Sequence, residues 1–181
     1  RTLDMDYNMI SVGDRVTELL EAGGIRVIHN RTLHDYPSYN GSYTRSLATI
    51  KSYLARYPSI QMVIDVHRDA IEDSSGKQVA TVFAQGEEKT ARIMLVMGTD
   101  EGGLSHPGWQ ENLSFALKLQ AGMERLQPGL ARSLSLRGQR FNQHMTPGSI
   151  LVEVGSAGDT LEQALRAAEG FTKALIQVIG R

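Results

Sequence analysis

Two stretches of the chain decide its fold, IQMVIDVHRDA at residues 60–70 and SILVEVGS at residues 149–156. Each is an apolar run of the kind that forms a strand buried on both faces of a sheet. His67 follows the apolar part of the first run directly, and Glu153 lies inside the second. An ionised carboxylate in an apolar setting must be paired, metal-bound or catalytic, because leaving it unpaired there is costly in free energy. These two positions therefore indicate an enzyme.

Helical and strand patterns surround the two runs. Apolar residues recur at helical spacing in four segments, at residues 4–22, 47–54, 109–126 and 161–179. Thr160 and Gln163 form a capping-box pattern that opens the last of these helices. Three shorter apolar stretches are predicted as strands, at residues 25–29, 79–84 and 92–97.

Helices that alternate with short apolar strands predict a single α/β domain. We expect a mainly parallel, twisted sheet with helices on both faces. Sheets of this kind bind ligands beyond the carboxyl ends of their strands. His67 and Glu153 belong at or near that edge, which makes them the first candidates for a functional site.

Composition narrows the functional classes. The chain has 181 residues, of which 41% are hydrophobic, and this suffices for one domain with a sizeable core. The net charge of −1 and the lack of a long basic run argue against a nucleic-acid partner. The sequence has no cysteine, which excludes disulfides and thiolate chemistry. Any metal must therefore be held by His, Asp or Glu, ligands that suit catalytic zinc.

Each candidate residue also has an ordinary structural explanation. A hydrolytic zinc site uses three protein ligands and keeps one position for water. His67 is either such a ligand or a core histidine that bonds the backbone. Glu153 is either a general base or the partner of an arginine such as Arg45 or Arg68. Asp4 begins the first predicted helix, where a plain N-cap is its usual role.

Several common catalytic motifs are absent from the sequence. The sequence has no His-Glu-x-x-His pair, which disfavours a helical zincin, and no Walker loop, which disfavours a P-loop nucleotide-binding domain. It also has no Gly-x-Ser-x-Gly elbow, which disfavours the common serine hydrolases. The loop tyrosines Tyr36, Tyr39 and Tyr43, together with Trp109, either stack on sugars or peptides or serve as packing residues.

Four segments stand in a specific order: HDYPSYNGSY at residues 34–43, DVHRDA at 65–70, HPGWQENL at 106–113 and PGSILVEVGSAG at 147–158. With these segments the chain closely resembles the stage II sporulation protein P family, a sporulation branch of the zinc-dependent N-acetylmuramoyl-L-alanine amidases. The resemblance covers essentially all of the chain and implies an amidase-type α/β fold.

The resemblance also implies the roles of site residues. Glu153 takes the place of the catalytic base, and His67 takes the place of a zinc (Zn²⁺) ligand. Asp4 best matches the acidic ligand, although the wider amidase family has glutamate there. Residues expected to contact substrate or to support the site are Arg45, Arg68, His106, Trp109 and His144.

One part of the family pattern has no counterpart here. The first strand of the family carries a His-Thr-His motif, and residues 1–181 do not contain it. We therefore expect a C-terminal catalytic amidase domain that lacks its N-terminal strand. Its third zinc ligand, a histidine, is expected upstream of Arg1 or on a separate chain, so the 181 residues alone should bind zinc weakly and hydrolyse poorly.

The implied activity is cleavage of peptidoglycan at the amide between N-acetylmuramic acid and L-alanine, with cleavage of stem-peptide cross-links as a second activity. The implied setting is forespore engulfment, in the septal space between mother cell and forespore, with the full-length protein anchored to the membrane. Implied partners are sporulation stage II protein D and protein M. Two alternatives stay open: a zinc endopeptidase, and a non-catalytic peptidoglycan-binding or scaffold domain of the cell-wall remodelling complex.

Overall fold

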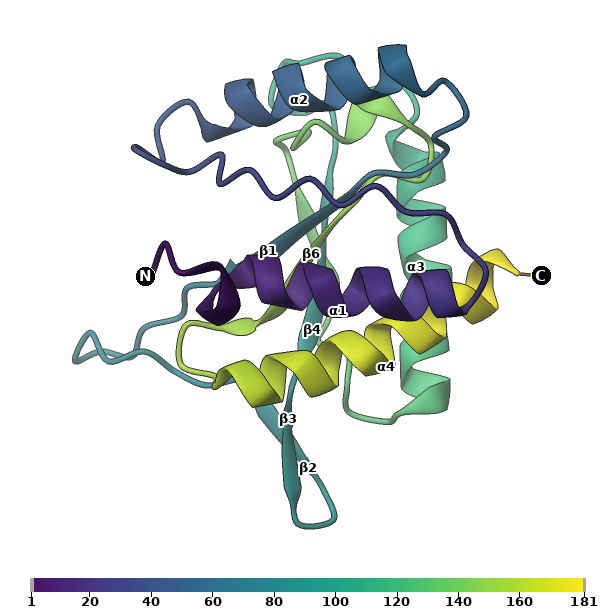
Figure 1. The fold of residues 1–181 in the computed structure, drawn as a ribbon. Helices are drawn as coiled ribbons and strands as arrows, with labels where there is room; N and C mark the ends of the chain where they lie inside the picture. Colours follow the sequence, from purple (N-terminus) through teal and green to yellow (C-terminus); the bar gives the residue numbers. More distant parts are fainter. Residues whose placement is uncertain (1, 181) are drawn as a thin grey trace.

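A computed structural model describes residues 2–180 of the chain (Figure 1). Its helices, 3₁₀ helices (η) and strands follow in the order η1 (Met5–Tyr7), α1 (Met9–Ala22), α2 (Ser42–Arg56), β1 (Ile64–Asp69), β2 (Val82–Gln85), β3 (Glu88–Ala91), β4 (Ile93–Gly98), α3 (Trp109–Leu126), β5 (Ser135–Arg137), η2 (Gln143–Met145), β6 (Ile150–Ser156) and α4 (Leu161–Ile179).

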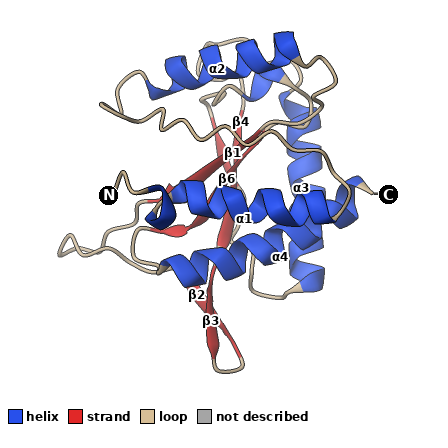
Figure 2. Cartoon of the chain, viewed as in Figure 1, coloured by secondary structure: helices blue, strands red, loops and turns tan. Residues whose placement is uncertain are grey.

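The central sheet has the strand order β1-β6-β4-β5. β1 pairs with β6 in parallel and β4 with β5 in parallel, whereas β4 and β6 are antiparallel. The predicted mainly parallel sheet is thus confirmed. β2 and β3 form a separate antiparallel hairpin that projects away from the sheet (Figure 2).

The register between β1 and β6 determines which of their side chains share a face of the sheet. Ile64 lies opposite Ile150 and Val66 opposite Val152, while His67 lies opposite Glu153. Side chains alternate between the faces along a strand. The aliphatic residues therefore share one face, and His67 and Glu153 share the other.

Three helices cover the apolar face. α1 packs against α4 and β1, and α3 packs against α4 and β4. Figure 1 shows α1 and α4 side by side across the sheet. The buried core between these helices and the strands includes Val12, Val16, Leu95, Met97, Leu119, Met123, Val152, Phe171 and Leu175.

The fourth helix, α2, lies over the polar face. Tyr43, in its first turn, stacks on His67 of β1 with ring centroids 6.4 Å apart. Helices therefore lie on both faces, as predicted. Among residues 2–180, no helix combines the length and apolar character needed to cross a bilayer.

The predicted strand at residues 25–29 is wrong. These residues have no regular secondary structure, and within the described chain residues 26–32 make no backbone–backbone hydrogen bond (Figure 2). A β-strand needs a neighbour that supplies hydrogen-bond partners. Within residues 2–180, β1 is paired on one side only, with β6, but a cavity separates its open edge from residues 25–29, which are therefore left unpaired.

Smaller differences concern element ends. Helix α1 begins at Met9 and not near Asp4, because the Asn8 side chain caps it by accepting from the backbone of Ile10 at 2.8 Å. β2 overlaps the strand predicted at residues 79–84, but it pairs with β3, and neither β3 nor the short strand β5 was predicted. The predicted capping box of α4 is confirmed, with Gln163 N donating to Thr160 Oγ1 at 3.2 Å.

Removing the cap of α4 is expected to destabilise the domain. Thr160→Ala deletes the side-chain acceptor and should lower the free energy of unfolding by about 1 kcal/mol. Urea denaturation followed by circular dichroism measures this loss. Thr44→Ala, at an exposed position of α2, is the matched control and should change the free energy by less than about 0.5 kcal/mol. Equal losses in both variants would argue against the cap.

Candidate active site

The polar face of the sheet brings three ionisable side chains together. Asp65 and His67 are two positions apart on β1, so they point to the same face. Asp65 Oδ1 lies 3.1 Å from His67 Nε2. Glu153 of β6 is the direct neighbour of His67 across the parallel pairing. The sequence therefore places an imidazole between two carboxylates.

The surroundings of Glu153 strongly perturb its carboxyl group. Its Oε2 is buried and has no hydrogen-bond partner. Burial raises the pKa of Glu153 to about 7, against the opposing effect of the neighbouring His67. Within residues 2–180 it forms no ion pair with Arg45 or Arg68, the two arginines suggested as structural partners. A carboxyl with a pKa near neutrality is suited to general acid–base catalysis.

His67 is held in place by its neighbours. Burial lowers the pKa of its imidazole, but the hydrogen bond and charge of Asp65, with further negative charge from Glu153 and Asp35, outweigh burial and raise the pKa. The side chain remains 32% exposed. His67 is thus not a core histidine that bonds the backbone alone, because its contact is with a carboxylate and part of its ring is accessible.

Aromatic rings form one wall of the site. The rings of Tyr43 and His67 are nearly parallel, at an interplanar angle of 11°. The ring of Phe141 packs against the ring of Tyr43, with centroids 5.7 Å apart. Burial raises the pKa of the Tyr43 phenol, so this group stays neutral at physiological pH.

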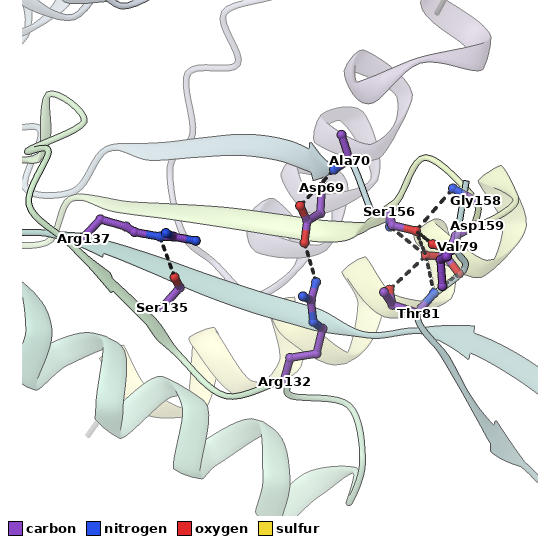
Figure 3. A network of polar contacts seen from close by, with 10 residues as sticks. All are labelled: Asp69, Ala70, Val79, Thr81, Arg132, Ser135, Arg137, Ser156, Gly158 and Asp159. Atoms are coloured by element: carbon purple, nitrogen blue, oxygen red, sulfur yellow. Dashed lines mark hydrogen bonds and ion pairs between the residues drawn. The ribbon is translucent and has the colours of Figure 1, made fainter. Parts of the chain in front are cut away.

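The carboxyl ends of β1 and β6 are fixed by two polar networks, drawn in Figure 3. Asp69, at the end of β1, accepts a bond of 2.7 Å from Arg132. Asp159 accepts from the backbone of Ser156 at 2.7 Å and from Thr81 N at 3.0 Å. These bonds tie the turn after β6 to the loop that leads into β2. The strand ends beside the site are therefore rigidly supported.

Asp4 and Arg45 have local roles in the structure. Asp4 is exposed, and its carboxylate caps η1 by accepting from Asp6 N at 3.1 Å. Arg45 donates to the backbone carbonyls of His34 at 2.7 Å and Asn40 at 3.2 Å, and also to that of Ser38. Arg45 thus fastens the loop that precedes α2. The ligand role of Asp4 stays a prediction.

The other candidate residues are dispersed. Arg68 is exposed, and Trp109 is a partly buried residue at the start of α3. His106 is only 1% exposed, and its ring meets that of His144 edge-on at 6.4 Å. Burial lowers the pKa of both histidines, with Arg140 acting in the same direction. A substrate role for these four residues stays a prediction.

The site opens into a large cavity of about 1590 Å³. Residues 24–30 and 32–35 line one side of it, and the free edge of β1, including Asp65 and His67, lines another. The unpaired stretch at residues 25–29 therefore faces the unpaired edge of β1 across this space.

The described residues fit a zinc site only in part. His67 and nearby carboxylates are suitable ligands. However, in the part of the chain that the structure describes, no cluster of three or more His, Asp or Glu side chains could hold a metal ion. Residues 2–180 thus do not contain a complete hydrolytic ligand set. The expected third ligand, a histidine upstream of Arg1, lies outside the described residues.

Sequence reasoning missed two contributors to this site. Asp65 could have been recognised, since the spacing Asp-x-His on a strand places both side chains on one face. The contact of Phe141 with Tyr43 had no signal in the sequence, because it joins segments about 100 residues apart.

The fold has a counterpart among solved structures. The structure is similar to the N-acetylmuramoyl-L-alanine amidase AmiC2 of Nostoc punctiforme, with a TM-score of 0.56 over 94% of this chain and 81% of that chain. The two sequences are 13% identical, so this likeness establishes an amidase-type α/β fold.

The family follows from the sequence. Residues 1–176 match the family described as stage II sporulation protein P (SpoIIP). The stage II sporulation protein P of Bacillus subtilis (strain 168) is 31% identical over 174 residues, which cover 89% of this chain and 40% of that relative. The chain belongs to the stage II sporulation protein P family, and it spans less than half the length of this curated relative.

The raised pKa of Glu153 predicts a pH-dependent effect on stability. The unfolded chain loses this proton near its ordinary pKa of 4.5, whereas the folded protein keeps it until about 7. The group therefore lowers stability as pH rises through this range. Glu153→Gln removes the penalty, so its gain in Tm over wild type should be larger at about pH 8 than at about pH 4.

Thermal unfolding in the presence of a chelator measures this difference. The matched control is Glu87→Gln in the exposed turn of the β2–β3 hairpin. It should show no such gain at the higher pH. An identical Glu153→Gln effect at both pH values would contradict the buried, protonated carboxyl.

Proposed function

We propose that this chain is the catalytic domain of a zinc-dependent peptidoglycan hydrolase. Its reaction would be hydrolysis of the amide between N-acetylmuramic acid and the L-alanine of the stem peptide, with cleavage of stem-peptide cross-links as a second activity. Membership of the stage II sporulation protein P family and the amidase-type fold support this proposal. The observation that carries it is the Glu153 carboxyl beside His67, whose Oε2 atom is buried without a hydrogen-bond partner.

Glu153 would act as general base and then as general acid. Its carboxylate takes a proton from the water that attacks the carbonyl carbon, and it later passes that proton to the nitrogen of the departing L-alanine. A pKa of about 7 lets one group perform both transfers near neutral pH. Asp65 would keep the imidazole of His67 oriented through their 3.1 Å contact.

The proposed zinc ligands are His67, Asp4 and a histidine from a segment preceding Arg1. Zinc, when bound, lowers the pKa of a water molecule and polarises the carbonyl group. The cavity supports the idea that another segment completes the site. An extended segment placed between β1 and residues 25–29 would satisfy the unpaired backbone groups on both sides.

The proposed setting is outside the cytoplasm, in the septal space between mother cell and forespore during engulfment. A membrane anchor would be supplied by a part of the protein beyond these residues. Peptidoglycan is the proposed substrate, and sporulation stage II protein D and protein M are the proposed partners.

Loss of the Glu153 carboxylate should abolish most turnover. In the longer protein that includes the segment upstream of Arg1, Glu153→Gln should lower kcat by about 100- to 10,000-fold. Zinc content, measured by atomic emission, should stay unchanged, because Glu153 is not a proposed ligand. Glu162→Gln, in the exposed first turn of α4, is the control and should retain activity.

Product analysis on purified muropeptides separates the possible reactions. A freed lactyl carboxylate with a new amino group on L-alanine identifies the amidase, and a new amino group within the stem identifies the endopeptidase. Unchanged turnover in Glu153→Gln would remove this residue from the mechanism. Absence of any cleavage by the wild-type longer protein would favour a binding or scaffold domain.

Zinc affinity should depend on the additional segment. Isothermal titration of the 181-residue chain with zinc should show weak binding, because the described residues lack a complete ligand set. The N-terminally longer protein should bind one zinc tightly, and His67→Ala should abolish that binding. Tight one-to-one binding by the 181-residue chain itself would contradict the proposed third ligand.

A further inference from the structure

Two consecutive residues outside the strands adopt an unusual backbone conformation. Phe141 has φ 46° and Asn142 has φ 60°, both in the left-handed region, and neither is glycine. Asparagine tolerates this region, but a bulky residue such as phenylalanine rarely enters it. Such a conformation persists only where the surrounding structure enforces it, and it occurs preferentially at functional sites.

The turn is anchored on one side to the sheet. Gln143, which follows it, donates to Val96 O at 2.8 Å and accepts from Gly98 N at 2.9 Å, and it is 2% exposed. The Asn112 amide of α3 donates to Gln143 O at 3.0 Å. The preceding segment lies directly on Gly98, where a Cβ atom would be only 2.2 Å from Gln139 O. The base of the turn is therefore fixed to the end of β4.

On its other side the turn reaches α2. The Asn142 amide donates to Tyr43 O at 2.8 Å and to Ser46 Oγ at 2.9 Å. Phe141 places its ring against the ring of Tyr43. α2 otherwise makes only sparse contacts with the other helices and strands. These bonds are thus a main link between the first turn of α2 and the sheet.

We infer that Asn142 is a positioning residue, which through the strained Phe141–Asn142 turn holds Tyr43 stacked on His67. The inference rests on the proposed function, in which His67 belongs to the reacting centre. Asn142 contacts the backbone of Tyr43 and not the reacting groups, so it acts through Tyr43. A donor amide is required, because the acceptor is a carbonyl oxygen.

Two variants separate the amide from the backbone conformation. Asn142→Gly permits the same positive φ but removes both hydrogen bonds. Asn142→Asp keeps the size of the side chain but replaces the donor with a carboxylate that repels Tyr43 O. Both should weaken the nuclear Overhauser contacts between the Tyr43 and His67 rings. Both should also lower kcat of the longer protein by about 10- to 100-fold, as misplacement of site groups does.

The readouts distinguish positioning from general stability. Asn8→Gly, the same substitution at the N-cap of α1, should leave the contacts between Tyr43 and His67 in place. If Asn142→Gly fails to fold, Ser46→Ala removes one of the two bonds without touching the turn, and it should weaken the same contacts to a smaller extent.

Two results would overturn the inference. One is unchanged ring contacts in Asn142→Gly and Asn142→Asp, whatever happens to turnover. The other is loss of ring contacts with full turnover. Failure of the proposed function gives a different result, no turnover in the wild-type protein, and the ring contacts then still report whether Asn142 positions Tyr43.

Discussion

The parallel pairing of β1 with β6 is the constraint on which the site depends. Its register places His67 beside Glu153. Neighbouring residues in a strand point to opposite faces. If the register of either strand shifted by one residue, its ionisable side chain would therefore move to the aliphatic face. The core packing of Val66 and Val152 against the helices therefore also fixes the polar side. The same pairing therefore sets the packing of the aliphatic face and the arrangement of the ionisable side chains on the other face.

The electrostatics follow from this arrangement. Glu153 lies between hydrophobic neighbours on its own strand and an imidazole on the next. Burial disfavours its charged form, and the carboxylates of Asp69 and Asp65 act in the same direction, while His67 opposes them. Because these carboxylates lie close to one another, the loss of a proton from one of them disfavours the loss of a proton from the next. The aromatic wall of Tyr43 and Phe141 adds a neutral surface beside this cluster.

The sequence was sufficient to predict the features that depend on local pattern. The apolar runs predicted β1 and β6, helical periodicity predicted α3 at its observed limits, and Thr160 with Gln163 predicted the start of α4. The four segments quoted from the sequence predicted the family that the comparisons show. Each of these signals lies within one segment, so no knowledge of tertiary contacts was required.

Features that depend on contacts between distant segments were not predictable in this way. Residues 25–29 have the composition of a strand but lack a neighbour within the described chain. Phe141 and Asn142 both have a positive φ, and the sequence at these two positions does not predict that conformation. The link from Asn142 to α2 joins residues almost 100 positions apart. Such features follow from packing, which a single sequence does not display.

The free edge of β1 has a consequence for the behaviour of this domain in solution. Within residues 2–180, the amide and carbonyl groups along this edge have no strand partner, and they offer a template on which a second molecule can add a strand. Two domains that associate in this way would each cover the approach to the other's His67, which lines the same edge. In concentrated samples of the isolated domain, self-association would then cover His67, and dilution would expose it again.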